Sequence, residues 1–122
     1  MLATDASRKG LGAALMQKDS RGKHRPIAFA SRILNSAESR YSVTELETLA
    51  IVWALRHFRD LIYGYDITVY TDHQAVKGLF KGKNLSGRLA RWLVILEDYQ
   101  PKIEYVPGKF QVVADALSPA LL

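Results

Sequence analysis

The segment VTELETLAIVWALRHF, from Val43 to Phe58, has the composition of a helix and carries two glutamates, Glu45 and Glu47, only two positions apart. Two residues of a helix turn through roughly 200°, so these two side chains point in opposite directions. Ser42 stands three residues before Glu45, which predicts a capping box at the start of the helix and a structural role for Glu45. We expect the helix to continue to about Ile62.

Glu47 stands at the start of an apolar stripe. Steps of three, four, seven and eight residues from it reach Ala50, Ile51, Ala54 and Leu55. The same kind of spacing from Glu45 reaches a set that we expect to be mostly in solvent, Thr48, Val52, Arg56 and Arg59. The pattern therefore predicts that Glu47 faces the core. An unpaired buried carboxylate is costly, so Glu47 is expected to be protonated, paired in a salt bridge or bound to a cation.

Stretches of alternating or β-branched residues on either side of this helix predict five strands. Their ranges are Leu2–Ser7, Leu11–Lys18, Arg25–Arg32, Asp66–Asp72 and Pro101–Gly108. Further helices are expected at 73–80, 87–99 and 111–118. The resulting order, β-β-β-α-β-α-α-β-α, predicts an α/β fold in which helices flank a five-stranded mixed sheet.

The composition restricts the class of protein. The 122 residues suit a single domain, 1–122, and 48% of them are hydrophobic, which is enough for a core. The apolar runs fall short of the roughly 20 residues of a membrane span, so we expect no membrane association. The chain has no cysteine, which excludes disulfides and cysteine-ligated metals. The net charge of +5 is compatible with a polyanion partner or with an ordinary basic surface.

Three aspartates occupy positions from which they could join Glu47 at one edge of the sheet. Asp5 and Asp72 end predicted strands, and Asp115 lies in the first turn of the last predicted helix. Each also has an ordinary interpretation, as a turn residue or as an acid at a helix N-terminus. Four acids in one environment would instead predict an all-oxygen site for Mg²⁺ or Mn²⁺. Carboxylates that hold two such ions form a clamp for phosphoryl chemistry without a covalent nucleophile.

Six blocks of sequence occur together and in order over nearly the whole chain. They are TDAS (4–7), GLGAALMQ (10–17), RPIAFASRILNSAESRYSVTELETLAIVWALRHFR (25–59), YTDHQAV (70–76), RLARW (88–92) and YVPGKFQVVADALS (105–118). These blocks resemble the ribonuclease H domain of long-terminal-repeat retrotransposon reverse transcriptases of the gypsy/Ty3 type. The resemblance implies a ribonuclease H-like fold. It also implies an endoribonuclease that cleaves the RNA strand of RNA–DNA hybrids by two-metal-ion hydrolysis, leaving 5′-phosphate and 3′-hydroxyl ends.

The family's D-E-D-D quartet matches Asp5, Glu47, Asp72 and Asp115, which the resemblance makes the catalytic ligands of two Mg²⁺ or Mn²⁺ ions. The family's E-x-x-A-[IL] pattern fits Glu47 and does not fit Glu45, in agreement with the helix-face argument. The resemblance implies that Asp5 bridges both ions. It also implies that Glu47 lies where the ribose 2′-hydroxyl is sensed, the group that distinguishes RNA from DNA.

The resemblance also suggests contacts with the hybrid. Ser7 and Gln74 correspond to residues near the scissile strand. Basic residues around the connection between the two middle helices are expected to contact phosphates: Lys77, Lys81, Lys83, Arg88 and Arg91. Exposed lysines commonly have no partner, so we expect the isolated domain to bind the hybrid weakly.

The sequence departs from many relatives before the last helix, where cellular and retroviral domains carry a histidine. This chain has the short loop PGKFQ, in which Lys109 is the only titratable group. His73, next to Asp72, is a further auxiliary candidate, either for proton transfer or as a supporting or surface histidine. Only four residues precede Asp5, so we expect a first strand shortened at its N-terminus, as in a fragment of a longer polyprotein.

Three functions remain open at this level. The first is a hybrid-specific ribonuclease that acts with the polymerase and neighbouring domains of a parent polyprotein, in the cytoplasm and within a virus-like particle. The second is a non-catalytic connection-type or fossil module of the same fold. The third is a metal-dependent DNA nuclease or integrase-type strand transferase. The complete quartet favours the first over the second, and the pattern around Glu47 favours it over the third.

Overall fold

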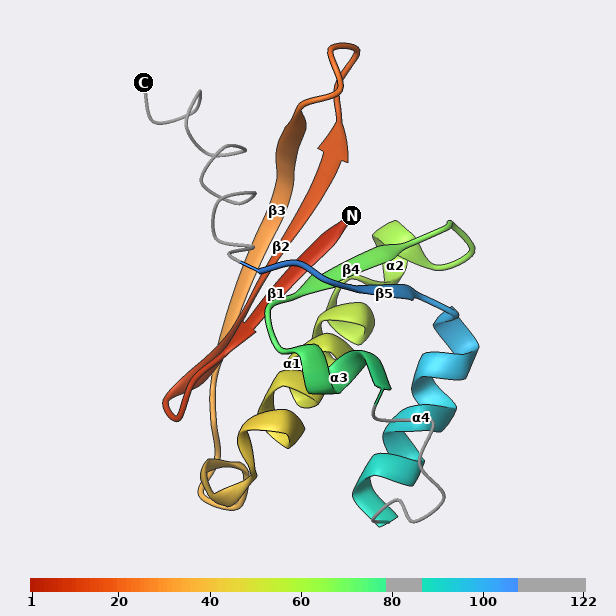
Figure 1. Ribbon diagram of the computed structural model, residues 1–122. Coiled ribbons are helices and arrows are strands. Elements are labelled where there is room, and N and C mark those ends of the chain that lie inside the picture. The colour runs from red at the N-terminus through yellow and green to blue at the C-terminus, as the bar shows by residue number, and fades with distance from the viewer. Residues whose placement is uncertain (79–86, 108–122) are drawn as a thin grey trace.

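The computed structural model describes residues 1–78 and 87–107. Its five-stranded sheet has the order β3-β2-β1-β4-β5 (Figure 1). The strands are β1 (Leu2–Ala6), β2 (Gly10–Lys18), β3 (His24–Ile33), β4 (Thr68–Thr71) and β5 (Lys102–Tyr105). The first three strands pair antiparallel, whereas β4 runs parallel to both β1 and β5. The predicted mixed sheet is therefore confirmed, and each strand lies close to its predicted range.

The described helices gather on one side of this sheet (Figure 1). They are the 3₁₀ helix η1 (Glu38–Arg40) and the α-helices α1 (Val43–His57), α2 (Arg59–Ile62), α3 (Gln74–Gly78) and α4 (Gly87–Tyr99). Helix α1 packs against β1 and β2 on one side and against α3 and α4 on the other. The helix predicted at 111–118 lies outside the described residues. Within the described ranges, no helix is both long enough and apolar enough to cross a membrane.

The predicted capping box is present at the start of α1. The backbone N–H of Glu45 donates to Ser42 Oγ at 3.1 Å, and the backbone N–H of Ser42 donates to Glu45 Oε1 at 3.0 Å. These two bonds satisfy groups that a helix start otherwise leaves without partners. They fix where α1 begins and therefore which way Glu47 points.

Two expectations for this helix were wrong. Helix α1 does not continue to Ile62, because Phe58 adopts φ −95° and ψ 15° and the short helix α2 follows it. Thr48 and Val52, expected in solvent, are only 0% and 3% exposed. They are buried because α1 is covered by the sheet on one side and by other helices on the other. The helix is thus a central layer of the fold, with little free surface from Leu46 to Leu55, whereas Val43 at its start is exposed.

Candidate metal centre

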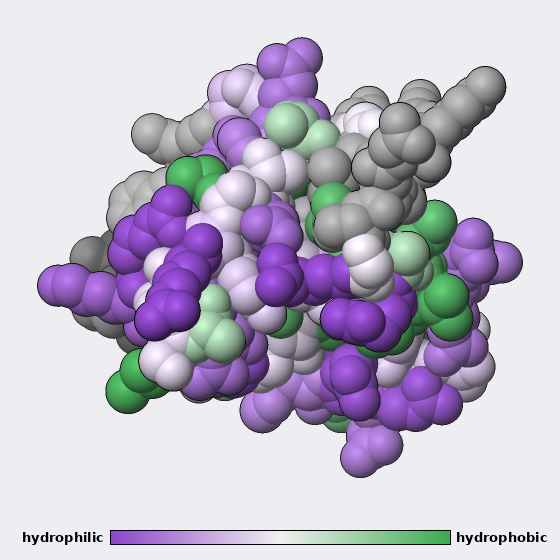
Figure 2. All heavy atoms as spheres, turned by 90° about the horizontal axis from the view of Figure 1, so that it is seen from below, coloured by the Kyte–Doolittle hydropathy of each residue, from purple (hydrophilic) through white to green (hydrophobic). Residues whose placement is uncertain are grey.

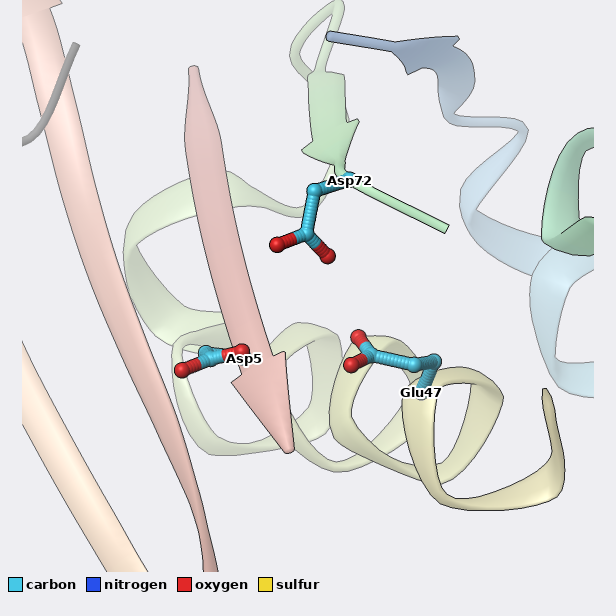
Figure 3. Close-up of side chains that lie close together, drawn as sticks. All are labelled: Asp5, Glu47 and Asp72. Carbon is cyan, nitrogen blue, oxygen red and sulfur yellow. The ribbon is translucent and has the colours of Figure 1, made fainter. Parts of the chain in front are cut away.

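Three acidic side chains from separate parts of the sequence meet at one end of the sheet. Asp5 comes from β1, Glu47 from α1, and Asp72 from the segment directly after β4. Each offers one carboxylate oxygen, and these three oxygens all lie within 4.8 Å of one another. Figure 3 shows the carboxylates of Glu47 and Asp72 turned toward each other beside the end of β1. Asp115, the fourth predicted ligand, lies outside the described residues.

The sheet topology brings the two aspartates together. Strands β1 and β4 are parallel neighbours with Leu2 opposite Val69 and Ala3 opposite Tyr70. Continuing this register by two residues places Asp5 beside Asp72. Because parallel neighbours end at the same edge of a sheet, both acids arrive there by backbone geometry alone.

Helix α1 supplies the third acid from beneath this edge. Glu47 is only 6% exposed, which confirms that it faces the core. Asp5 and Asp72 are exposed, so the cluster has a buried base and an open mouth. Carboxylates held this close repel one another when ionised. A set of carboxylate oxygens with solvent access is the donor set that Mg²⁺ and Mn²⁺ prefer, so these residues fit such an ion.

An open cavity of about 380 Å³ adjoins the cluster. Its lining includes Asp5 and Ser7 from the end of β1 and Lys9, Gly12 and Ser31 from the neighbouring strands and turn. Gly12 pairs directly with Asp5 across β1 and β2, and a Cβ built on it would have no atom within 4 Å. Space next to Asp5 is therefore open from the side of β2. Lys9 and Ser31 were not singled out from the sequence. Ser31 follows from its register with Gly12 once the sheet is known, and Lys9 lies in the turn before β2.

Ser7 has a local structural role in addition to its position in this cavity. Its Oγ accepts hydrogen bonds from the backbone N–H groups of Lys9 and Gly10, at 3.1 and 3.3 Å. This arrangement closes the turn between β1 and β2. Gln74 is exposed at the start of α3, and Arg91 is exposed on α4. Their contacts with a hybrid stay predictions, and Lys81, Lys83 and Lys109 lie outside the described residues.

Arg88 has protein partners that its predicted phosphate-binding role did not anticipate. Its Nη1 donates to Glu45 Oε2 at 2.6 Å, and its guanidinium lies 3.8 Å from the centre of the Tyr41 ring. The Ser42 backbone N–H, followed by the Arg88 guanidinium, holds the pKa of Glu45 below its ordinary range. Arg88 therefore ties α4 to the start of α1. Glu45 is committed to structure, as the capping box predicted.

His73 is held by the start of α1. Its Nε2 lies 2.8 Å from Thr44 Oγ1, a hydrogen-bond distance. Its backbone N–H donates to Thr71 Oγ1 at 3.2 Å. These contacts hold His73 beside Asp72, and the two interpretations of His73 that the sequence left open stay predictions. Thr44 was not identified from the sequence, where nothing indicates a partner 29 positions away.

The chain matches a family model described as the RNase H-like domain found in reverse transcriptase, over residues 1–99. It is 47% identical over 118 residues to the Retrovirus-related Pol polyprotein from transposon opus of Drosophila melanogaster, covering 96% of this chain and 12% of that polyprotein. The corresponding polyprotein from transposon gypsy of the same fly is 41% identical over 118 residues, covering 96% of this chain and 11% of the relative. The chain thus spans a small part of these relatives.

Two solved structures resemble the fold of this chain. The foamy viral protease-reverse transcriptase in complex with RNA/DNA hybrid is 28% identical, with a TM-score of 0.64 over 88% of this chain and 15% of that chain. RNase H1 from the archaeon Halobacterium salinarum NRC-1 is 20% identical, with a TM-score of 0.63 over 98% of this chain and 95% of that chain, and it supports the fold alone. The fold is therefore ribonuclease H-like, and the chain belongs to the RNase H-like domains of reverse transcriptase, in the group carried by gypsy/Ty3-type retrotransposon Pol polyproteins.

Proposed function

We propose that this domain is a metal-dependent endoribonuclease that cleaves the RNA strand of RNA–DNA hybrids during reverse transcription. The observation that carries the proposal is the convergence of Asp5, Glu47 and Asp72, whose oxygens lie within 4.8 Å of one another. Membership of the reverse transcriptase family supports the class of substrate. The expected products carry 5′-phosphate and 3′-hydroxyl ends.

In this proposal Asp5, Glu47 and Asp72 hold the metal, and Asp115 is the fourth ligand. Two bound Mg²⁺ or Mn²⁺ ions would activate the attacking water and stabilise the leaving oxygen. The burial of Glu47 restricts its side chain and so keeps its carboxylate in place. The exposure of Asp5 and Asp72 leaves the mouth of the site accessible to a phosphodiester. We also propose that the ribose 2′-hydroxyl of the RNA strand, a group that DNA lacks, lies next to Glu47.

A basic, polar surface supports a nucleic-acid substrate. The face seen from below, where the β1–β2 turn, η1 and the start of α4 lie, is largely hydrophilic (Figure 2). These elements carry four exposed cations, Arg8, Lys9, Arg40 and Arg91. Cations that neutralise phosphates contribute affinity that is independent of sequence and falls with salt. We propose that Lys9, Arg91, Lys81 and Lys83 contact the hybrid backbone, and that Ser7 and Gln74 contact it closer to the metal site.

The relatives are polyproteins, and the solved relative named above is a reverse transcriptase bound to RNA/DNA hybrid. We therefore propose that this domain works beside a polymerase and the neighbouring domains of a Pol polyprotein, in a cytoplasmic virus-like particle. Contacts from the polymerase would add to the affinity for the hybrid. The isolated domain is expected to bind it weakly and to be more sensitive to salt.

The direct test is an end-labelled RNA annealed to DNA, incubated with the protein and Mg²⁺ or Mn²⁺, with the same RNA alone and matched duplex DNA as controls. Internal cleavage of the RNA in the hybrid alone, abolished by EDTA, supports the proposal. A hybrid that is bound and left intact would identify a non-catalytic module. Cleavage of the duplex DNA would identify a DNA nuclease or strand transferase.

A further inference from the structure

The two elements that carry Glu47 and Asp72 are joined by a side-chain hydrogen bond. Thr44 Oγ1, in the first turn of α1, lies 2.8 Å from Nε2 of His73, the residue after Asp72. The two residues are 29 positions apart in the chain, and both side chains are half-buried. The bond therefore crosses from the start of the central helix to the end of β4, directly beside the metal centre.

Both ends of this bond are attached to rigid segments. The backbone N–H of His73 donates to Thr71 Oγ1, which is fully buried, and the His73 carbonyl accepts from the backbone N–H of Val76 at 3.1 Å. Asp72 thus lies between two residues that are each held in place. Thr44 is three residues before Glu47, so the two side chains are neighbours on the helix surface.

We propose that Thr44 is a positioning residue that, through His73, sets the separation between the Glu47 and Asp72 carboxylates and thereby the affinity for the metal. The inference rests on the proposed function, because it assumes that these carboxylates bind a divalent cation. Residues that hydrogen-bond directly to metal ligands typically contribute 10–100-fold to metal affinity, and Thr44 acts one residue further away, so we expect an effect at the lower end of this range. Without the hydroxyl, the segment after β4 would lose this link to α1, and the separation of the two carboxylates would be less closely fixed before the ion binds.

The test compares hydroxyl changes on one helix, all in the full chain. Thr44→Val keeps a β-branched side chain and removes the hydroxyl, whereas Thr44→Ser keeps the hydroxyl and removes the methyl group. Thr48→Val is the matched control, since its hydroxyl donates to the Thr44 carbonyl within the helix, at 2.8 Å, and does not reach His73 in the structure. The affinity for Mn²⁺ alone is measured from the free-ion electron paramagnetic resonance signal. Hybrid cleavage gives kcat and KM, and urea unfolding gives stability.

We expect Thr44→Val to weaken Mn²⁺ binding about tenfold, Thr44→Ser to restore most of the affinity, and Thr48→Val to change stability without changing Mn²⁺ affinity. His73→Ala should weaken binding to the same extent as Thr44→Val, and the double variant should be no weaker, because each change removes the same bond. Equal Mn²⁺ affinity in wild type and Thr44→Val, or equal losses in Thr44→Val and Thr48→Val, would overturn the positioning role. A wild-type chain that binds no Mn²⁺ would instead overturn the proposed function.

Discussion

Two buried glutamates of the described residues, Glu38 and Glu47, are each 6% exposed, and the charged groups around them differ. The Glu38 carboxylate accepts from two nitrogens of Arg32, at 2.8 and 2.5 Å, and from the backbone N–H of Asn35 at 3.0 Å. The Arg32 guanidinium holds the pKa of Glu38 below its ordinary range. Glu38 is therefore stabilised by a cation that belongs to the protein.

Glu47 instead shares its surroundings with the carboxylates of Asp5 and Asp72. At Glu38 the negative charge contributes to stability, because a guanidinium and an N–H group face it. At the metal centre the fold brings like charges together, an arrangement that becomes favourable when divalent cations bind. Equal burial thus accompanies an ion pair in one region and, in the proposed function, a metal ligand in the other. The same substitution, acid to amide, should separate the two.

The largest effect is expected from Asp72→Asn. This change removes a charged ligand, and metal ions supply several kcal/mol of transition-state stabilisation, so cleavage should fall about 1,000-fold or more. Stability without metal should stay the same or rise, because one repelling charge is gone. Single-turnover cleavage and urea unfolding of the same preparations measure both quantities. Near-normal turnover would remove Asp72 from the site.

Glu47→Gln and Glu45→Gln form a matched pair within one helical turn. Glu47→Gln should lower cleavage by about 100-fold, since it changes a proposed ligand. Glu45→Gln should keep most of the activity and lower stability by about 0.5–1 kcal/mol, because it removes the charge of the ion pair with Arg88, whereas a glutamine can still form the capping box. Steady-state cleavage of the hybrid compares the two. Equal losses of activity would break the distinction between the two sides of the helix.

Glu38→Gln should show the opposite behaviour. It leaves the Arg32 guanidinium without its counter-charge and should cost about 2 kcal/mol of unfolding free energy. Cleavage per folded molecule should change less than about threefold, because this residue lies outside the acid cluster. Urea denaturation, with activity measured well below the unfolding midpoint, provides the comparison. A stable but inactive Glu38→Gln protein would contradict the assignment of structure to one region and function to the other.

The smallest effect concerns acid pH. Glu38 and Glu45 both have lowered pKa values in the folded state. Below the unfolded glutamate value of about 4.3, the unfolded chain takes up protons that the folded chain does not. The stabilisation that these two carboxylates contribute is therefore fully present above that pH. It is lost as the pH falls through their lowered pKa values in the folded state. Urea midpoints measured from about pH 5 to 3 should drop more steeply for wild type than for Glu38→Gln. Parallel curves would contradict this linkage.

Much of the fold could be predicted because the signals were local. The capping box of α1 follows from Ser42 and Glu45, and the range 87–99 of α4 follows from apolar residues at helical spacing, such as Leu89, Trp92 and Leu96. The end of α1 at His57 could not be predicted in this way, because neither glycine nor proline marks the break. The burial of Thr48 and Val52 depends on a second layer of helices, which periodicity along one helix does not reveal.

The acidic residues of the candidate site could be predicted from the sequence, but the residues that hold their neighbours in place could not. Asp5 and Asp72 stand at strand ends, and Glu47 interrupts an apolar stripe, so each leaves a mark in the sequence. The partners that hold neighbouring residues are distant in the chain: Arg88 for Glu45, and Thr44 for His73. Hydrogen bonds over such separations depend on packing, and an arginine that binds phosphate looks the same in sequence as one that binds a glutamate.

Metal binding by the three carboxylates is tested by a crystal of this domain soaked in Mn²⁺, with anomalous scattering recorded at the manganese edge. We expect strong anomalous density in contact with carboxylate oxygens of Asp5, Glu47 and Asp72, and its loss in Asp72→Asn crystals. Saturating Mn²⁺ with no anomalous density among these three carboxylates, or with density only at other acids, would contradict this expectation.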